Sequence, residues 1–395
     1  MITTLLPNHA TSIYKEMRQG AEERVASFDV KKWLKQALQS SVEQEFIEIM
    51  RVNPYERSPE RQNYRNGFYE RSLDTVYGWI EGLKIPRLRE AGWEPSVFKR
   101  YGRREEAINK LIVECYWRGI STRDVKHVLK KLSGVEVSCA TVSRLTNQWQ
   151  AQVMRWHSRS LLDDYVYLFL DGVWIKNRSL GNKKRLVLVA YGVRSNGQRE
   201  IIDYQLSITE KQEHWERFLN YLKHRGLEGK NLKLIVTDGC HGLWNAIDMV
   251  YPGVSHQLCL AHKMRNILDK VKKDDHEKVH QGLKNIFDEK VTTQKQAQVI
   301  INKWKTKWRR TYPNAVQCLE RDEERLFNYF KCPVEHHKAV RTTNHIERQF
   351  KELRRRMRSQ EIIPNKYAAD KMLYALIQIR NEKLRDYPMQ QFTQF

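Results

Sequence analysis

The sequence predicts an α/β protein in which helices flank a mixed β-sheet, with an all-helical insertion and with helical and β-hairpin regions before the sheet. Three observations carry this prediction. Strand and helix patterns alternate over 161–267, a long helical stretch follows over 268–335, and shorter helical and hairpin patterns precede both. A chain of 395 residues with 41 % hydrophobic content can bury a large core in two or three domains.

The N-terminal part of the chain divides into three predicted regions. Residues 1–62 have mixed charge and weak helical periodicity, which predicts a helical arm. Residues 63–103 contain β-prone runs on both sides of Gly78, which predicts a small basic β-hairpin. Three short helices follow over 104–160, with Ser138 in position to cap the third. Helices in this order predict a helix-turn-helix DNA-binding domain.

The third of these helices is the candidate recognition helix. It carries Thr141, Ser143 and Arg144, whose side chains are the candidate contacts to base edges in the major groove. The alternative is a helical bundle that only links domains, because nothing in the spacing requires that the helix enter a groove.

The central part of the chain has the pattern of a sheet protein. Segments rich in β-branched and aromatic residues predict strands at 165–170, 186–193, 201–206 and 232–237. Helical spacing predicts one helix over 213–223 and another over 242–250. The resulting order β-β-β-α-β-α is that of an RNase H-like sheet. We assign 161–267 to the first part of this core, 268–335 to the helical insertion and 336–395 to the final helices of the core.

Charge is the unusual feature of the composition. The chain has 70 Lys and Arg against 47 Asp and Glu, a formal net charge of +23. This excess predicts a polyanionic partner, whereas the alternative is that the charge only keeps the protein soluble. No run of about 18 apolar residues and no signal-peptide pattern is present, so we expect no membrane partner. We expect a cytoplasmic protein.

Three acidic residues are the candidate catalytic groups. Asp171 and Asp238 each follow an apolar predicted strand, and the glycine after each gives the backbone room to turn. Glu347 lies on a later helix, one step from its apolar stripe. The alternatives are ordinary ones, because Asp-Gly is a common turn and Glu347 would close a capping box if Asn344 caps its helix.

Carboxylates of this kind suit metal-dependent cleavage of a phosphodiester. Two Mg²⁺ or Mn²⁺ ions need hard oxygen ligands, and three carboxylates suffice to hold both. Asp171, Asp238 and Glu347 are therefore the predicted metal ligands. Nearby basic side chains are the candidate DNA contacts: His262, Lys263, Arg265, Arg341, Arg348, Lys351, Arg354, Arg355 and Arg358.

At these residues the sequence resembles the Mutator-like bacterial insertion-sequence transposases, also called the insertion sequence 256 group. Four motifs carry the resemblance: Leu170-Asp-Gly-Val-Trp-Ile-Lys, Thr237-Asp-Gly-Cys-His-Gly-Leu-Trp-Asn-Ala-Ile, Cys259-Leu-Ala-His262-Lys-Met-Arg-Asn, and Arg341-Thr-Thr-Asn-His-Ile-Glu347-Arg-Gln-Phe-Lys-Glu-Leu-Arg-Arg-Arg. The resemblance extends upstream through Arg65-Asn-Gly-Phe-Tyr-Glu-Arg, Ile85-Pro-Arg and Gly119-Ile-Ser-Thr-Arg-Asp-Val, so it covers roughly residues 60 to 380. His345 departs from the family pattern, where a small or apolar residue is common.

The resemblance implies an RNase H-like catalytic fold with an all-helical insertion before the catalytic Glu, and it implies a DDE triad of Asp171, Asp238 and Glu347. The substrates it implies are the terminal inverted repeats of an insertion sequence and a target DNA. Hydrolytic nicking would be followed by attack of the freed 3′-hydroxyl on a second phosphodiester, without a covalent protein intermediate. Because two ends must be paired, we expect a homodimer or a higher oligomer.

The Cys-x-x-His motif allows two interpretations. Cys259 and His262 would bind zinc only with two more ligands, which Cys332 and either His336 or His337 would have to supply. We favour the other interpretation, in which Cys259 packs in the core and His262 contacts DNA or a carboxylate near the active site.

Two other classes of function compete with transposition. A DNA-binding regulator would use only the helix-turn-helix, and its C-terminal region would oligomerise. An RNase H-like nuclease or resolvase would cut DNA without joining it. The helix-turn-helix together with the long insertion favours transposition. A serine or tyrosine recombinase fits less well, since the candidate groups are acidic and not hydroxyl nucleophiles.

Overall fold

The structure is a computed structural model that describes most of the chain. The described residues are 29–53, 55–90, 93–97, 102, 104–118, 120–176, 184–358 and 366–389. The chain forms two compact units, one of Met1–Cys115 with Thr122–Leu145 and the other of Tyr116–Ser121 with Thr146–Phe395. Residues 1–28 of the predicted N-terminal arm lie outside the described residues.

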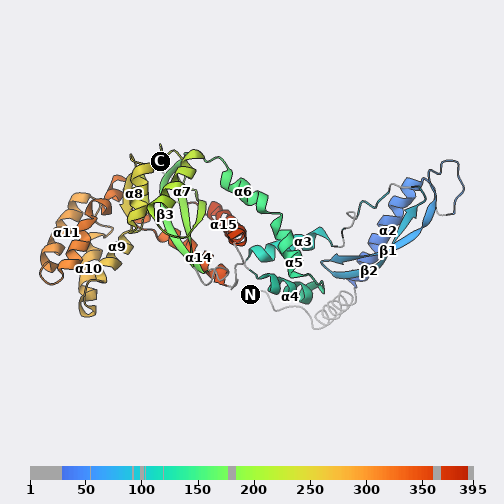
Figure 1. The fold of residues 1–395 in the computed structure, drawn as a ribbon, viewed down its shortest axis with the longest axis horizontal. Helices are drawn as coiled ribbons and strands as arrows, with labels where there is room; N and C mark the ends of the chain where they lie inside the picture. Colours follow the sequence, from blue (N-terminus) through green and yellow to red (C-terminus); the bar gives the residue numbers. More distant parts are fainter. Residues whose placement is uncertain are drawn as a thin grey trace, which may run out of the picture. The chain divides into compact units, whose positions relative to one another are not determined.

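A helix packed on a hairpin forms one part of the first unit (Figure 1). Its elements are α2 (Val30–Met50), β1 (Arg65–Thr75) and β2 (Gly78–Leu88). The strands pair antiparallel, and Gly78 begins β2 with a φ of 117°, which a residue with a Cβ rarely adopts. Val42 of α2 packs with Leu73 and Ile80 of the hairpin in a small separate core.

Three short helices follow in the order that the sequence predicts. They are α3 (Glu106–Trp117), α4 (Thr122–Ser133) and α5 (Cys139–Asn147). Their apolar faces are buried, as at Ile112, Leu129 and Val142. The Ser138 hydroxyl accepts a hydrogen bond from the backbone N–H of Thr141 at 3.1 Å, so Ser138 caps α5 as expected.

A five-stranded mixed sheet is the centre of the second unit (Figure 1). Its strands are β3 (Tyr165–Lys176), β4 (Lys184–Arg194), β5 (Arg199–Ser207), β6 (Leu234–Thr237) and β7 (Ser255–Leu258). Their spatial order is β5-β4-β3-β6-β7, with the first three antiparallel and the pairs β3–β6 and β6–β7 parallel. The predicted order β-β-β-α-β-α is confirmed.

The fifth strand, β7, was not predicted because its sequence is polar. Gln257 is nevertheless fully buried there. Its amide donates to the carbonyl of Leu326 at 2.9 Å, and its carbonyl accepts from the backbone N–H of Tyr329 at 2.9 Å. A buried polar side chain is stable when its hydrogen bonds are made in this way, and such partners cannot be read from the sequence.

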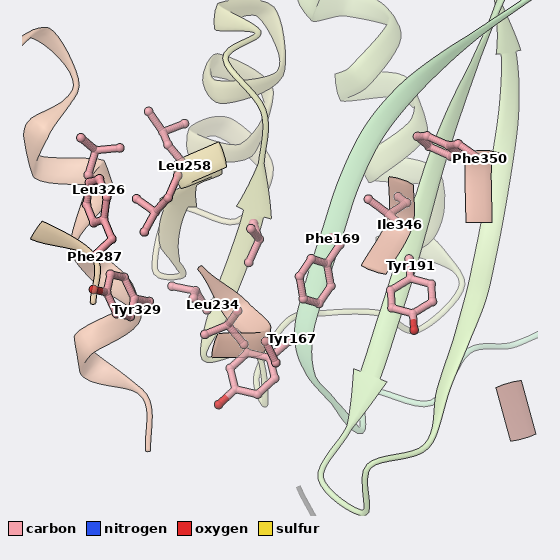
Figure 2. Packing of buried hydrophobic residues seen from close by; sticks show 14 of the residues in the cluster. Tyr167, Phe169, Tyr191, Leu234, Leu258, Phe287, Leu326, Tyr329, Ile346 and Phe350 are labelled. Atoms are coloured by element: carbon pink, nitrogen blue, oxygen red, sulfur yellow. The ribbon is translucent and has the colours of Figure 1, made fainter. Parts of the chain in front are cut away.

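Helices cover both faces of the sheet. One face packs against α7 (Gln212–His224) and α8 (His241–Val250). The other packs against α9 (Leu260–Leu268), α14 (Asn344–Arg358) and α15 (Lys366–Asp386). In Figure 2, Phe169 and Tyr191 of the sheet lie beside Ile346 and Phe350 of α14, which fixes this helix against the strands.

The segment 268–335 is helical, and all of its residues are described. Its α-helices are α10 (His276–Ile286), α11 (Gln294–Trp308) and α12 (Pro313–Arg321), and its short 3₁₀ turns are Lys273–Asp275, Glu323–Leu326 and Asn328–Lys331. A further turn at Val334–His336 and α13 (His337–Val340) lead to α14. No helix among the described residues is long and apolar enough to cross a membrane.

A buried ionic network joins α6 (Gln150–Ser158) to β5 and α15. His157 contacts Asp203 at 2.7 Å and Asp370 at 3.3 Å, and Asp203 also pairs with Arg225. Burial alone would lower the pKa of His157, but the hydrogen bonds to the two carboxylates outweigh it and raise this pKa to about 9. His157 is therefore a cation at neutral pH, and it ties the helix before the sheet to the last helix of the chain.

This network predicts a pH-dependent stability. Because the folded pKa of His157 lies above its ordinary value of 6.5, its contribution is complete below pH 6.5 and is lost as pH rises through about 9. We expect His157→Gln to lower the free energy of unfolding by up to about 3 kcal/mol at the acidic end and by much less above pH 9. Urea unfolding of both proteins across this range measures the difference. A difference that does not change with pH would contradict the assignment.

Candidate active site

The parallel pairing of β3 and β6 brings two carboxylates together. The last pair in this ladder is Leu170 with Thr237, so the next residues, Asp171 and Asp238, come at the same level of neighbouring strands. Parallel neighbours lie about 4.8 Å apart. The carboxylate of Asp238 accepts from the N–H of Cys240 at 3.2 Å, which holds it where the chain leaves the sheet.

The strand that carries Asp171 does not end there, contrary to the prediction. β3 continues to Lys176, and Asp171 pairs with Val189 of β4 while Gly172 pairs with Leu188. Asp171 and Gly172 are therefore not a turn. A Cβ at Gly172 would stand 2.8 Å from Oε1 of Glu210, so a larger residue here would have to displace this carboxylate.

Glu347 comes from the first turns of α14. Asn344 is already helical, and the N–H of Glu347 donates to the carbonyl of Thr343 at 3.0 Å. Its carboxylate accepts from the Thr343 hydroxyl at 3.3 Å and lies 3.6 Å from Nε2 of His262. The capping box with Asn344 as cap is therefore not formed, and the carboxylate of Glu347 faces α9.

The three acids share one partly dehydrated site. Asp171 is only 7 % exposed, and burial raises its pKa well above the ordinary value, with the charges of Asp238 and Glu347 adding to the effect. Burial also raises the pKa of Asp238. A raised pKa means that the site resists carrying this much negative charge without a cation.

The carboxylates of Asp171, Asp238 and Glu347 are the kind of ligands that a divalent cation binds, although they are not arranged closely enough to surround one. Within the described part of the chain, no three His, Cys, Asp or Glu side chains stand close enough to enclose a metal ion. Carboxylates repel one another when no cation is present, and Glu347 lies beside His262. Carboxylate oxygens are nevertheless the ligands that Mg²⁺ and Mn²⁺ prefer.

The Cys-x-x-His motif supports the start of α14. Cys259 is buried, and its Sγ accepts from the N–H of Thr343 at 3.3 Å and from its hydroxyl at 3.2 Å. The hydrogen bond with Cys259 raises the pKa of His262 to about 9, against the opposing effect of burial. The imidazole is thus a cation that lies between Thr343 and Glu347.

The ligands that a zinc site would need are elsewhere. His336 Nδ1 is 2.8 Å from the hydroxyl of Tyr167, and His337 Nε2 is 2.9 Å from the carbonyl of Cys332. None of them forms a cluster with Cys259 in the described residues. The geometry therefore agrees with the interpretation that we favoured.

A fourth acid, Glu210, is absent from the predicted set. It precedes α7, and its Oε1 lies over Gly172 of β3. Burial, followed by the charge of Asp238, raises its pKa to about 7. No motif surrounds this residue in the sequence, so only the folding of the β5–α7 connection against β3 reveals it.

A pocket of about 250 Å³ adjoins Asp238. Its walls come from the chain after β6, from α8 and α9, and from α12 of the helical segment, and they include His241, Asn266, Lys270 and Arg321. The lining mixes these polar and basic side chains with acids, such as Asp269 and Asp322, and with apolar groups, such as Trp244.

The basic side chains that the sequence predicts as DNA contacts near the acids differ in their exposure to solvent. Arg265, Arg348, Lys351 and Arg354 are exposed, and so is Arg355, which pairs with Glu352 at 2.9 Å. The side chain of Arg358 lies outside the described residues. Lys263 does not fit the prediction of a DNA contact, because it is buried and its Nζ pairs with Asp322. Arg341 is half-buried, and it donates to the carbonyl of Phe287 at 2.6 Å.

On the candidate recognition helix, two of the three predicted residues face solvent. Ser143 and Arg144 of α5 are exposed. The hydroxyl of Thr141 lies 3.0 Å from that of Ser138, so its first role is in the cap of the helix. An exposed Arg with a short polar neighbour is a suitable combination for contacts in a DNA groove.

Comparisons with known proteins find a family model and relatives that match most of the chain. The family model described as "Transposase, Mutator family" matches residues 9–386. The chain is 34 % identical to the transposase for insertion sequence element IS256 in transposon Tn4001 of Staphylococcus aureus, over 93 % of this chain and 94 % of that protein. It is 32 % identical to the transposase for insertion sequence element ISRM5 of Rhizobium meliloti, over 87 % and 85 % of the two chains.

A search of solved structures finds the Drosophila P element transposase strand transfer complex. It matches with a TM-score of 0.30 and 12 % identity, over 75 % of this chain and 85 % of that one. A superposition this loose does not establish a shared fold.

Because the carboxylates of the site repel one another, we expect the removal of one of their charges to raise the free energy of unfolding. With metal removed by a chelator, we expect Asp171→Asn to raise the free energy of unfolding by about 1–2 kcal/mol, because it removes a negative charge that burial and the neighbouring acids disfavour. Asp203→Asn is the matched control. Asp203 is also buried but pairs with Arg225, so Asp203→Asn should lower the free energy of unfolding by about 3 kcal/mol. Urea unfolding measures both, and equal losses would contradict the prediction.

Proposed function

Because the chain belongs to the Mutator family of transposases, we propose that it cuts and joins DNA with Asp171, Asp238 and Glu347 as its catalytic carboxylates. One observation carries the proposal. Asp171 and Asp238 lie at the end of one parallel strand pair, the charge of Glu347 acts on both, and burial raises the pKa of both aspartates. Structural carboxylates with this burial usually have cationic partners.

The sheet supports an RNase H-like assignment for the catalytic domain. Three antiparallel strands are followed by two short parallel ones, and the helices lie on both faces. We propose that the helical segment 268–335 is an insertion in this fold. Its ion pair from Asp322 to Lys263 of α9 fastens it beside the carboxylates.

Each group of the chain has a defined task in this proposal. Two Mg²⁺ or Mn²⁺ ions bound to the carboxylates would activate the attacking oxygen and stabilise the leaving one. Asp171, on a strand buried at the centre of the sheet, provides the rigid ligand. Glu347 is oriented by Thr343, and Cys259 holds Thr343 in turn. His262 is cationic at neutral pH and lies where it can neutralise a phosphate oxygen.

We propose that the DNA substrates are the terminal inverted repeats of the element and a target duplex. The net charge of +23 and the exposed basic side chains of α14, such as Arg348 and Lys351, support a DNA partner. Ser143 and Arg144 on α5 would read the repeat. Hydrolysis would free a 3′-hydroxyl, which then attacks a second phosphodiester, so the two ends require at least two protomers. We further propose that the protein acts at the nucleoid in the cytoplasm.

The catalytic assignment predicts the loss of chemistry without the loss of binding. On a labelled transposon-end duplex with Mg²⁺ or Mn²⁺, we expect Asp171→Asn, Asp238→Asn and Glu347→Gln to reduce nicking and strand transfer on the order of 10³-fold or more. Their affinity for the duplex should stay close to that of the wild type. Gel assays of cleavage and joining, with parallel anisotropy measurements, test both parts.

Glu352→Gln is the matched control, since it makes the same chemical change on α14 at an acid that pairs with Arg355. It should keep the wild-type rate. Full activity in any of the three variants would remove that residue from the site. Binding without cleavage by the wild type would favour a DNA-binding regulator, and cleavage without joining would favour a nuclease or resolvase.

The metal assignment has a readout that does not depend on activity. Adding Mg²⁺ at about a hundred times its dissociation constant should stabilise the wild type by about 3 kcal/mol, because only the folded state has the site. We expect a rise in melting temperature for the wild type and for Glu352→Gln, and no rise for Asp171→Asn or Asp238→Asn. An equal rise in all four proteins would place the ion elsewhere.

A further inference from the structure

A pocket lined by arginines lies at the end of the sheet opposite to the carboxylates. It has a volume of about 270 Å³. We call it the arginine pocket, and its lining residues are Arg159, Tyr165, Arg194, Gln198, Arg199, Glu200, Asn381 and Arg385. Four guanidinium groups thus share this space with a single carboxylate, so the pocket is strongly cationic.

The carboxylate, that of Glu200, already lies within ion-pair distance of two of the arginines, Arg194 and Arg159. Glu200 accepts from the hydroxyl of Tyr165 at 2.6 Å and from Arg194 at 2.8 Å, and it lies 3.7 Å from Arg159. Arg159 also donates to the carbonyl of Ile202 at 2.7 Å. These contacts make Arg159 and Arg194 part of the wall of the pocket.

The positive charges of the other two arginines, Arg199 and Arg385, are not paired with a carboxylate in the part of the chain that the structure describes. No carboxylate lies within ion-pair distance of Arg199 or Arg385 there. The guanidinium of Arg199 interacts with the buried hydroxyl of Tyr191, whereas the side chain of Arg385 is exposed. Asn381 exchanges two hydrogen bonds with the backbone of Ile201, at 2.8 and 3.0 Å. This fixes α15 to β5, and Arg385 follows Asn381 by one helical turn on the same face.

The position of the arginine pocket relates it to the candidate active site. Tyr165 begins β3 and Asp171 lies six residues later on the same strand. At about 3.3 Å per residue, Tyr165 and Asp171 are roughly 20 Å apart along the strand. A duplex advances about 3.4 Å per base pair, so this distance corresponds to about six base pairs.

We propose that the arginine pocket binds a backbone phosphate of duplex DNA, about 20 Å from the phosphodiester that reacts. This inference rests on the proposed function, because it takes the partner to be DNA. Guanidinium groups match phosphate oxygens in geometry as well as in charge, and Arg199 and Arg385 are the two that have no carboxylate partner among the described residues. Free inorganic phosphate has the same chemistry, and an acidic peptide is the remaining alternative for such a pocket.

The test measures DNA affinity in the full chain with the background change Asp171→Asn and without divalent metal, so that no cleavage occurs. Arg385→Ala and Arg199→Gln should each weaken binding of a fluorescent duplex by roughly three- to tenfold. Each should also reduce the slope of log Kd against log salt by about one. Arg385→Lys, which keeps the charge, should recover part of the affinity. Circular dichroism melting curves identify any variant whose fold is impaired.

Lys383→Ala is the matched control, because it removes the same charge from an exposed position of the same helix. It should change affinity and slope less than Arg385→Ala. Equal losses would overturn the proposal in favour of general attraction. Unchanged duplex binding in Arg385→Ala would also overturn it, and in that case titration with inorganic phosphate alone would show whether the pocket is a free-anion site.

Failure of this inference can be told apart from failure of the proposed function. The binding assay uses neither metal nor cleavage, so it does not depend on the three carboxylates. If Arg385→Ala binds DNA as the wild type does while the carboxylate variants lose nicking and joining, only the arginine pocket is misassigned. If the wild type shows no binding to any duplex, both proposals fail.

Discussion

The parallel pairing of β3 with β6 is the constraint on which the rest of the candidate site depends. Its last pair, Leu170 with Thr237, puts Asp171 and Asp238 at one level of the sheet. A shift of one residue in this register would turn Asp171 to the other face, away from Glu347. Because both faces of β3 are buried, under α7 and α8 on one side and α14 on the other, such a shift would expose the core. The packing that stabilises the fold therefore also positions the carboxylates.

The groups around Asp171 and Asp238 keep negatively charged side chains in a buried place, where burial disfavours their charged form. Cys259 orients Thr343, Thr343 contacts Glu347, and the cationic His262 stands beside it. These contacts connect α9 to the start of α14 through side chains. The cationic His262 compensates the negative charge of the acids only in part, because the pKa values of Asp171 and Asp238 remain raised. Such a conflict between local stability and function is typical of active sites.

The large positive charge of the chain is divided between two uses. Some basic groups make buried ion pairs that fasten elements together, as Arg225 does with Asp203 and Lys263 with Asp322. Others remain on the surface or in the arginine pocket with few acidic neighbours. Net charge alone does not separate these uses, because a buried pair and an exposed cation count equally in a sequence. Only the basic groups on the surface or in the arginine pocket are available to bind a polyanion.

The sequence by itself determined the mixed sheet, the order of its first four strands, the helices that follow them and the family motifs, because periodicity and local residue preferences are encoded over short stretches. It also singled out Asp171, Asp238 and Glu347 as candidates. Only the tertiary structure decided that β3 continues past Asp171, that the polar segment 255–258 is a strand, that Lys263 is buried, and that Glu210 approaches the site. Each of these depends on partners far away in the chain, and a local pattern has no means of specifying such partners.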